Sequence, residues 1–151
     1  MIRTVKMHLW LLIVIVLFPF LKIEAVEKIK LQTVAATNVI QLRGHIILPP
    51  GKKLNKQAPS KITLFEKVGP SWEQVSEIKL TDYFTTSEKL DVSREIKLKS
   101  STSRLKVTAS LYHCDRVTSQ YCGIDDFEGE VGRNPTKSSN VLNIDLAGSS
   151  K

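Results

Sequence analysis

The sequence lacks most of the motifs on which enzymatic catalysis depends. It contains only two cysteines and no Cys-x-x-Cys pair, so the active-site motif of thioredoxin-like oxidoreductases is missing. It also contains no Gly-x-Ser-x-Gly, no His-Glu-x-x-His and no phosphate-cradling glycine loop, the motifs of common hydrolases, zinc proteases and nucleotide-binding proteins. We therefore expect no catalytic residues and no cofactor in this chain.

Long hydrophobic runs are missing as well, except at the N-terminus. Residues 1–25 begin with two basic residues, continue through an apolar block from Leu9 to Leu21 and reach a small residue at Ala25, as secretory signal peptides do. The block is too short for a membrane-spanning helix, which needs about 20 residues. We expect cleavage after Ala25 and export to the periplasm or the extracellular space. An uncleaved N-terminal anchor is the alternative, because Ile23 is large for its position before the cut.

The part after the expected cleavage site has the size of one domain. Of the 22 basic and 15 acidic residues in the chain, 19 and 14 lie in residues 26–151, which gives this part a net charge of +5. Its lysines are spread along the whole length, which favours a solvated surface over a single anion-binding patch. We expect one domain over residues 26–146 and a flexible tail at 147–151.

Helical periodicity is nearly absent after residue 26, and short alternating segments bounded by Pro, Gly, Ser and Asn recur instead. This pattern predicts an all-β fold, an immunoglobulin-like antiparallel β-sandwich of about seven strands. A short helical turn competes with a loop at 81–91, and residues 132–140 are expected to form an exposed loop. The strands are expected at residues 27–34, 38–48, 61–67, 72–80, 92–98, 104–114 and 140–146.

Alternation of hydrophobic and polar residues predicts which side of a strand faces the core. In residues 104–114 the same parity that buries the hydrophobic positions places Tyr112 and Cys114 on the opposite side. In residues 61–67 the alternation is weaker, and the Gly69-Pro70-Ser71 turn predicts a hairpin between this strand and 72–80. The residues expected on the core side of the first strand are Leu105, Val107, Ala109 and Leu111. In the second strand Ile62, Leu64 and Glu66 share one side and Thr63, Phe65 and Lys67 the other, and the alternation leaves open which side faces the core.

Two stretches together resemble a known family. The stretches 47–66 and 105–122 look like the C-terminal β-domain of large NHL-repeat proteins that also contain a thioredoxin-like domain, and residues 42–122 are covered. A fainter similarity links the chain to the N-terminal immunoglobulin-like domain of bacterial thiol-disulfide interchange proteins. After Cys122 the sequence departs from the family, which continues with a strongly apolar strand. The matching residues are Leu48, Pro49, Gly51, Lys53, Leu54, Asn55, Ala58, Pro59 and Ser60 in the first stretch and Leu111, Tyr112, Cys114 and Cys122 in the second.

The resemblance implies an accessory domain without its catalytic neighbour. The chain has neither the thioredoxin motif nor the length for a propeller of NHL repeats, so thioredoxin activity does not carry over. A thioredoxin-like partner is what the resemblance implies for the interactions of this domain.

The run from Leu48 to Ser60 has two interpretations. It can be a rigid connection between strands, in which Gly51 supplies a turn with positive φ and Leu54 enters the core. It can also be a basic loop that binds an acidic partner, an anionic surface or a phosphate. We do not expect nucleic acid binding, because aromatic residues are not interleaved with these lysines. The lysines of this candidate loop are Lys52, Lys53, Lys56 and Lys61.

Three chemistries compete for Cys114 and Cys122. In an oxidising compartment a structural disulfide closing the turn after a strand is the leading interpretation. A redox exchange site is the alternative, because Arg116 and a protonated His113 could stabilise a Cys114 thiolate. A zinc site would need two further ligands, which only His45 and His113 could supply, so we expect no metal.

The acidic run at 125–130 is expected to be a solvated loop. Its four carboxylates do not have the spacing of an EF-hand, so calcium binding is not predicted. The sequence as a whole thus predicts an exported, non-enzymatic binding or accessory module, with an envelope or secreted protein as its partner. The alternative is a redox-interacting domain in which Cys114 and Cys122 exchange with a thioredoxin-like partner.

Overall fold

The structure is a computed structural model that describes residues 26–83, 88–101 and 103–149. The predicted signal peptide, residues 1–25, lies outside the described residues. Among the described residues the chain is all-β, with one short 3-10 helix, η1 (Leu80–Tyr83), which overlaps the start of the region 81–91 where a helical turn competed with a loop. The strands are β1 (Glu27–Lys28), β2 (Val34–Ala35), β3 (Val39–Ile47), β4 (Lys52–Leu54), β5 (Lys61–Val68), β6 (Ser71–Lys79), β7 (Lys89–Lys97), β8 (Leu105–Asp115), β9 (Gly123–Val131), β10 (Arg133–Asn134) and β11 (Val141–Ala147).

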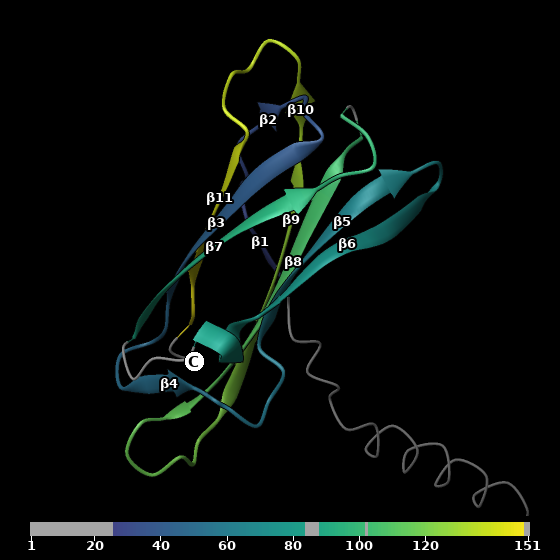
Figure 1. Cartoon of the computed structure of the whole chain (residues 1–151). Coiled ribbons are helices and arrows are strands. Elements are labelled where there is room, and N and C mark those ends of the chain that lie inside the picture. The colour runs from purple at the N-terminus through teal and green to yellow at the C-terminus, as the bar shows by residue number, and fades with distance from the viewer. Residues whose placement is uncertain (1–25, 84–87, 102, 150–151) are drawn as a thin grey trace, which may run out of the picture.

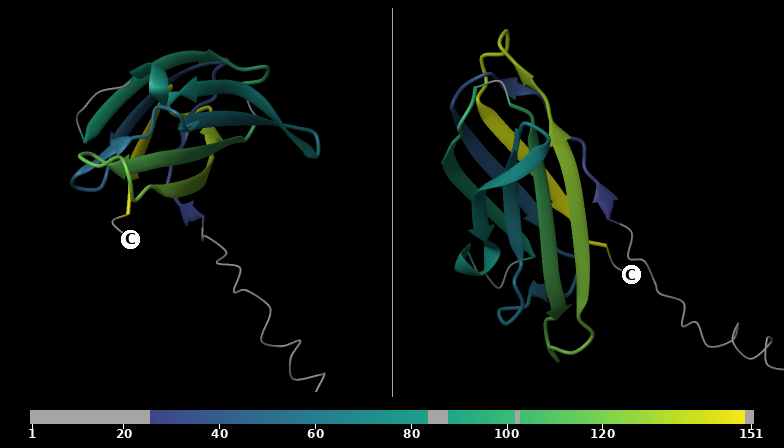
Figure 2. Two further views of the ribbon diagram at one scale, coloured as in Figure 1. Left: turned by 90° about the horizontal axis from the view of Figure 1, so that it is seen from below. Right: turned by 90° about the vertical axis from the view of Figure 1, so that its right-hand side faces the viewer.

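Two sheets pack face to face as a sandwich (Figure 1). The larger sheet has the order β1-β9-β8-β5-β6, with β4 paired to the end of β8, and the smaller sheet has the order β11-β3-β7. A two-stranded ribbon of β2 and β10 lies at one end. The left view of Figure 2 shows the two curved layers, with the β5–β6 hairpin extending beyond the other strands.

The core forms between the layers because alternate residues of each long strand are apolar. In β8 the side chains of Leu105, Val107 and Leu111 are fully buried, as the alternation predicted. In β5, where the alternation left the inward face open, the side with Ile62, Leu64 and the fully buried Glu66 faces the core.

Gly44 in the middle of β3 leaves room for side chains from both sheets. A Cβ atom there would lie 2.7 Å from Cγ2 of Val92 on the neighbouring strand β7 and 3.3 Å from Cδ1 of Ile62 on the opposite sheet. Only glycine leaves enough space for this contact without a shift of the neighbours.

The all-β sandwich is confirmed, and six of the seven predicted strands match observed ones to within about three residues. The β5–β6 hairpin is also confirmed, with Gly69 at φ 57° in its turn. The seventh predicted strand, residues 27–34, is not continuous, because this segment forms the two short strands β1 and β2. The sandwich is not purely antiparallel, because β1 pairs with β9, β2 with β10, and β11 with β3 in parallel.

The prediction of a solvated acidic loop at 125–130 is wrong. These residues belong to β9, which pairs with β8 over nine residues and buries Phe127 in the core. The carboxylates beyond Asp125 point to the outer face, where Glu128 binds Lys28 and Asp126 accepts a hydrogen bond from Ser110. Partners on neighbouring strands stabilise this acidic strand, although its own sequence resembles that of a loop.

Residues 148 and 149 of the predicted tail make hydrogen bonds to the rest of the fold. Gly148 N donates to Ile47 O, and Ser149 donates to Asp125 through its backbone N and its hydroxyl. Residues 150 and 151 lie outside the described part. No helix within the described ranges is long and apolar enough to cross a membrane.

Candidate functional site at the disulfide-closed end

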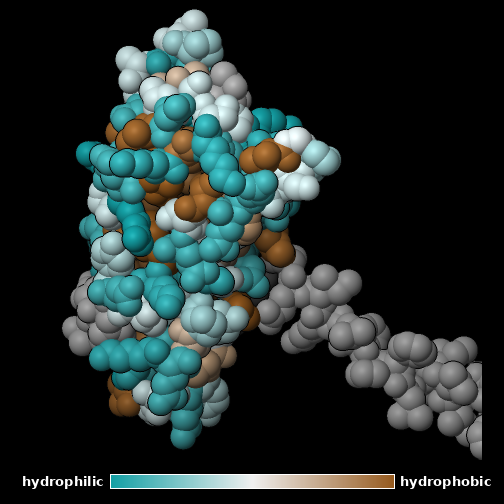
Figure 3. Space-filling view, turned by 45° about the vertical axis from the view of Figure 1, so that its right-hand side comes forward, coloured by the Kyte–Doolittle hydropathy of each residue, from teal (hydrophilic) through white to brown (hydrophobic). Residues whose placement is uncertain are grey.

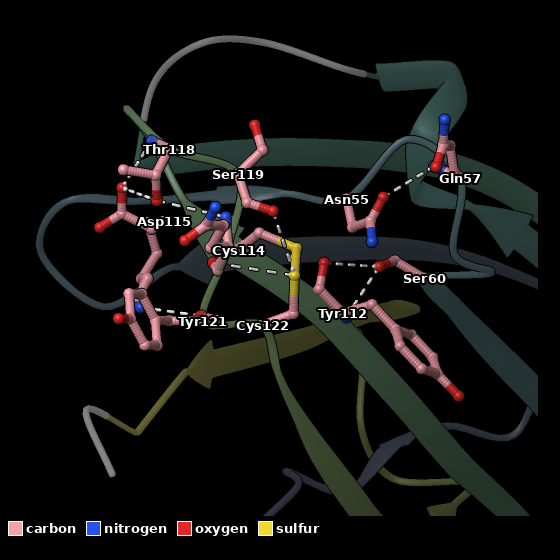
Figure 4. The surroundings of a disulfide bond; sticks show 12 residues. Asn55, Gln57, Ser60, Tyr112, Cys114, Asp115, Thr118, Ser119, Tyr121 and Cys122 are labelled. Carbon is pink, nitrogen blue, oxygen red and sulfur yellow. Dashed lines mark hydrogen bonds between the residues drawn. A yellow bond between two sulfur atoms is a disulfide. The ribbon is translucent and has the colours of Figure 1, made fainter.

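Cys114 and Cys122 form a disulfide at one end of the sandwich (Figure 4). Cys114 lies near the end of β8 and Cys122 directly before β9, so the bond closes the β8–β9 turn, as the leading interpretation predicted. The two cysteines differ in exposure: Cys114 is only 4% exposed, whereas Cys122 is exposed. The bond therefore joins a buried sulfur to one near the surface.

Asp115 orders the first half of the turn. Its carboxylate oxygen Oδ1 accepts hydrogen bonds from the backbone N of Thr118 and of Val117, each 3.0 Å long. These bonds favour the ionised carboxylate and hold the pKa of Asp115 below its usual value. The turn is thus stabilised by a side chain at its start and by the disulfide at its base.

The second half of the turn has unusual backbone conformations. Ser119 has φ 55° and Tyr121 has φ 45°, in the left-handed region that residues with bulky side chains rarely adopt. The Lys52 ammonium donates a hydrogen bond of 3.1 Å to the Tyr121 carbonyl. Backbone strain of this kind needs support from surrounding structure, and it is often found at binding sites.

Hydrophobic side chains project from this constrained turn. Val117 is 90% exposed and Tyr121 is 79% exposed, more than the other exposed large hydrophobic residues of the described chain. Single exposed apolar residues are common, but here two of them share one disulfide-closed turn. We call residues 115–122 the disulfide-closed loop.

Both stretches that carry the family resemblance meet at this end. Strand β4 pairs antiparallel with the end of β8, so that Lys53 lies opposite Cys114 and Lys52 opposite Asp115. Gly51, at φ 74°, makes the turn before β4, and its carbonyl accepts a hydrogen bond from Arg116 N. The loop with Gly51 therefore packs directly beside the disulfide.

The residues after β4 continue this contact. Ser60 is buried, and its hydroxyl accepts a hydrogen bond of 2.9 Å from Tyr112 N, while Asn55 N donates to Tyr112 O (Figure 4). Leu54 enters the hydrophobic core, as the structural interpretation of this loop predicted. The Tyr112 ring points away from the disulfide.

The four lysines of the candidate basic loop lie on β4, on the turn that follows it and at the start of β5. Lys52 and Lys53 lie on β4 beside the disulfide, and Lys56 is exposed on the following turn. Lys61 begins β5 and forms an ion pair of 2.9 Å with Glu77 on β6. Only the first two lysines border the disulfide-closed loop through strand pairing.

The groups expected to activate Cys114 have other partners. Arg116 forms an ion pair of 3.2 Å with Glu88, and His113 Nε2 lies 2.9 Å from the Asp125 carboxylate. The expectation that Cys114 is the reachable sulfur is wrong, because the bonded Cys122 and the adjacent β4 occupy the space around it. If either sulfur reacts with a partner, it is Cys122.

Within the described part of the chain, no group of three or more Cys, His, Asp or Glu side chains is placed so that it could hold a metal ion. His45 lies on the outer face of the smaller sheet, with Nδ1 2.6 Å from Asp91. It borders an open groove of about 570 Å³ whose other lining is mostly polar, including Arg43 and Asp145.

No protein-family model matches the chain, and a search of curated proteins finds no match either. The resemblance to the NHL-repeat and thiol-disulfide interchange domains therefore stays a prediction based on the two stretches quoted above.

The sequence analysis did not single out Val117 and Tyr121. The signal that could have found them is a hydrophobic residue among polar turn-forming residues between two cysteines. When a disulfide closes so short a loop, its side chains cannot reach the hydrophobic core and are left exposed. The pairing of β4 with β8 could not be read from the sequence, because it joins residues about 60 positions apart.

Proposed function

We propose that this chain is an exported, non-enzymatic β-sandwich that acts as a binding or accessory module for another protein of the envelope or the extracellular space. The observation that supports this proposal best is the exposure of Val117 and Tyr121 on the disulfide-closed loop. Tyrosine is among the residues that most often dominate binding energy at protein interfaces. A loop that is already ordered loses little conformational freedom when it binds.

The test compares binding by the wild-type chain with binding by two double variants. Val117→Ser with Tyr121→Ser removes the apolar tip of the loop. Ile47→Ser with Val68→Ser removes two exposed hydrophobic residues elsewhere, each 39% exposed, and serves as the control. Proteins captured from envelope extract by the wild type should be captured by the control and lost by the loop variant. An identical set captured by all three would contradict the proposal.

A redox role is the second candidate, and the unequal exposure of the two cysteines favours it. A thiolate of a thioredoxin-like partner would attack the Cys122 sulfur, and Cys114 would leave as a thiolate while a mixed disulfide forms. A second thiol of the partner would then attack this mixed disulfide and release Cys122 as a thiolate. The partner ends oxidised, and this chain ends with two reduced cysteines.

Two measurements separate the redox role from a structural disulfide. A reduction potential below about −300 mV indicates a structural bond, whereas a value near those of exchange proteins supports redox work. The variant Cys114→Ser leaves the exposed Cys122 free to trap a mixed disulfide, and Cys122→Ser leaves only the buried Cys114. Mixed disulfides found with the first variant but not the second would support exchange at Cys122.

A further inference from the structure

A second group of unusual side chains lies on the outer face of the larger sheet, far from the disulfide. It consists of Phe65 and Lys67 of β5, Trp72 of β6 and Lys106 of β8, and we call it the lysine–aromatic cluster. Strand register brings these residues together, since Phe65 is paired with Lys106 and Lys67 with Trp72. All four are partly exposed.

Both ammonium groups lie over the same indole ring. Lys67 Nζ is 5.1 Å and Lys106 Nζ is 5.0 Å from the centre of the Trp72 ring, and Lys106 Nζ is also 5.3 Å from the centre of the Phe65 ring. Each contact is a cation–π interaction that restricts a long, flexible side chain. Both positive charges are thereby positioned around one aromatic ring.

Neither ammonium group makes the direct ion pair that several neighbouring cations make, although Glu130 lies opposite Lys106 and the charge of Lys106 helps to lower the pKa of Glu128. Lys99 pairs with Glu73, Arg104 with Glu130, and Lys28 with Glu128. Neither Lys67 nor Lys106 forms a salt bridge with a carboxylate that the structure describes, although Lys67 donates a hydrogen bond to the Pro70 carbonyl. The cluster therefore carries two ammonium groups without a direct ion pair among the described residues, and Glu128 and Glu130 of β9 border it on the side of Lys106.

We propose that the lysine–aromatic cluster binds an anionic polysaccharide. The carboxylate or sulfate groups of such a polymer would lie against the two ammonium groups, and its hydroxyl groups would meet polar side chains on the same face. Gln74 lies beside Phe65 and is exposed, and Thr108 follows Lys106 on the same face of β8. An extended polymer can run along an exposed sheet face, where repeated weak contacts add up.

Other anionic ligands fit the cluster less well. Single-stranded nucleic acid binds by stacking bases on free aromatic faces, whereas ammonium groups already lie over both of these rings. A membrane surface would favour a broad apolar or strongly basic patch. In Figure 3 the hydrophobic surface is instead divided into small patches among hydrophilic residues.

The lysine–aromatic cluster lies well away from the disulfide-closed loop. Lys106 lies near the start of β8 and Cys114 near its end, so the cluster and the disulfide-closed loop lie toward opposite ends of one strand (Figure 1). The module could thus hold a polymer at one end and a protein at the other. Polymer binding does not depend on the disulfide-closed loop, so either proposal can fail without the other.

The experiment measures binding of the full chain to heparin and to polygalacturonate, with neutral dextran, polyglutamate and a thymidine oligonucleotide as comparison ligands. The variant Lys67→Ala with Lys106→Ala should lower affinity for at least one of the two polysaccharides by tenfold or more. The control, Lys52→Ala with Lys53→Ala, removes the same charge at the other end of the molecule and should stay within twofold of the wild type. Thermal unfolding of both variants checks that they are folded.

A third variant separates charge from geometry. Trp72→Ala keeps both lysines but removes the ring that holds them, so it should also weaken polysaccharide binding. Equal losses in the two lysine variants would show that only total charge matters and would overturn the proposal. Tighter binding to polyglutamate or to the oligonucleotide, or no binding to either polysaccharide, would overturn it as well.

Discussion

At the scale of single residues, Glu66 is an uncommon case of a fully buried carboxylate in a small β-sandwich. It accepts hydrogen bonds from the backbone N of Lys99 and of Ser100, at 2.9 and 2.8 Å, and from the Ser103 hydroxyl. Burial by itself raises the pKa of Glu66, but these bonds and the charge of Arg133 outweigh it, so the pKa lies below its usual value. One side chain thus fixes the connection between β7 and β8.

The change Glu66→Gln should reduce the free energy of unfolding by about 2 kcal/mol at pH 7, because an amide NH2 would face a buried backbone donor. A depressed pKa in the folded state stabilises the fold above the unfolded-state pKa, about 4.3, and this contribution is lost as pH falls below it. Urea unfolding should therefore show a smaller difference between wild type and variant at pH 3 than at pH 7.

The matched control for this prediction is Glu77→Gln. Glu77 is less buried and pairs with Lys61 at the surface, so its loss should cost at most about 1 kcal/mol. An equal difference between wild type and Glu66→Gln at both pH values would show that the charge of Glu66 is not what stabilises the fold.

Residue-level prediction from sequence worked where alternation alone decides burial. It placed the hydrophobic residues of β8 correctly, but in β5 it did not decide whether the side with Glu66 or the side with Phe65 faces the core. It failed at Cys114, because parity describes an open strand, whereas the disulfide and β4 lie against this residue in the fold. It also gave no partner for Glu66, since its donors lie more than 30 residues away in the sequence.

At the scale of elements, the disulfide links the ends of β8 and β9. Replacing both cysteines by serine should lower the free energy of unfolding by about 2.5 kcal/mol, the chain-entropy value for a loop of about nine residues. For a domain of this size the melting temperature should fall by roughly 10 °C. An unchanged melting temperature under oxidising conditions would contradict a stabilising role for the bond.

The edges of the two sheets are a second feature at this scale. β6 and β7 are edge strands that approach each other at one side of the sandwich, and unpaired edges can join with edges of other molecules. Arg94 occupies a core-side position of β7, opposite Leu42, and donates a hydrogen bond of 3.4 Å to the Glu77 carbonyl of β6. A register irregularity after Leu64 further disturbs the β6 edge.

Arg94→Val should therefore promote association between molecules, because it removes a charge from the edge and frees a β6 carbonyl. Light scattering after size-exclusion chromatography should show dimers or aggregates at concentrations where the wild type is monodisperse. Arg43→Val is the control, since Arg43 lies on β3, the central strand of the smaller sheet. If both variants behave as the wild type does, Arg94 does not protect the edge.

A strand could be predicted from the sequence only where its own residues carry the pattern of a strand. Long alternating strands such as β3 and β8 were found from their own residues. β9 was missed because its carboxylates find partners on other strands, such as Lys28 for Glu128, whose pKa this hydrogen bond lowers. β4 was missed because three residues between prolines and turn formers show no alternation.

At the scale of the whole molecule, the two chain ends contribute very differently to the fold. β11 lies parallel to β3 along the smaller sheet and buries Leu142, Ile144 and Leu146 almost completely. β1 also pairs in parallel, with β9, but it contains two exposed residues. The sequence predicted a strand near each end but not its neighbour, because pairing between distant strands leaves no local pattern.

This difference predicts opposite results for two truncations of the chain that begins at Val26. Ending it at Asn140 removes three fully buried core side chains, and the burial of each contributes roughly 1.5–3 kcal/mol. It also leaves one edge of β3 without a paired strand. This loss is comparable to the total stability of a small domain, so cooperative unfolding should disappear in urea or heat. Starting it at Ile29 removes only the short exposed β1 and should change the free energy of unfolding by no more than about 1 kcal/mol. A cooperative melt after the C-terminal truncation would mean that β11 covers the core without being needed to form it.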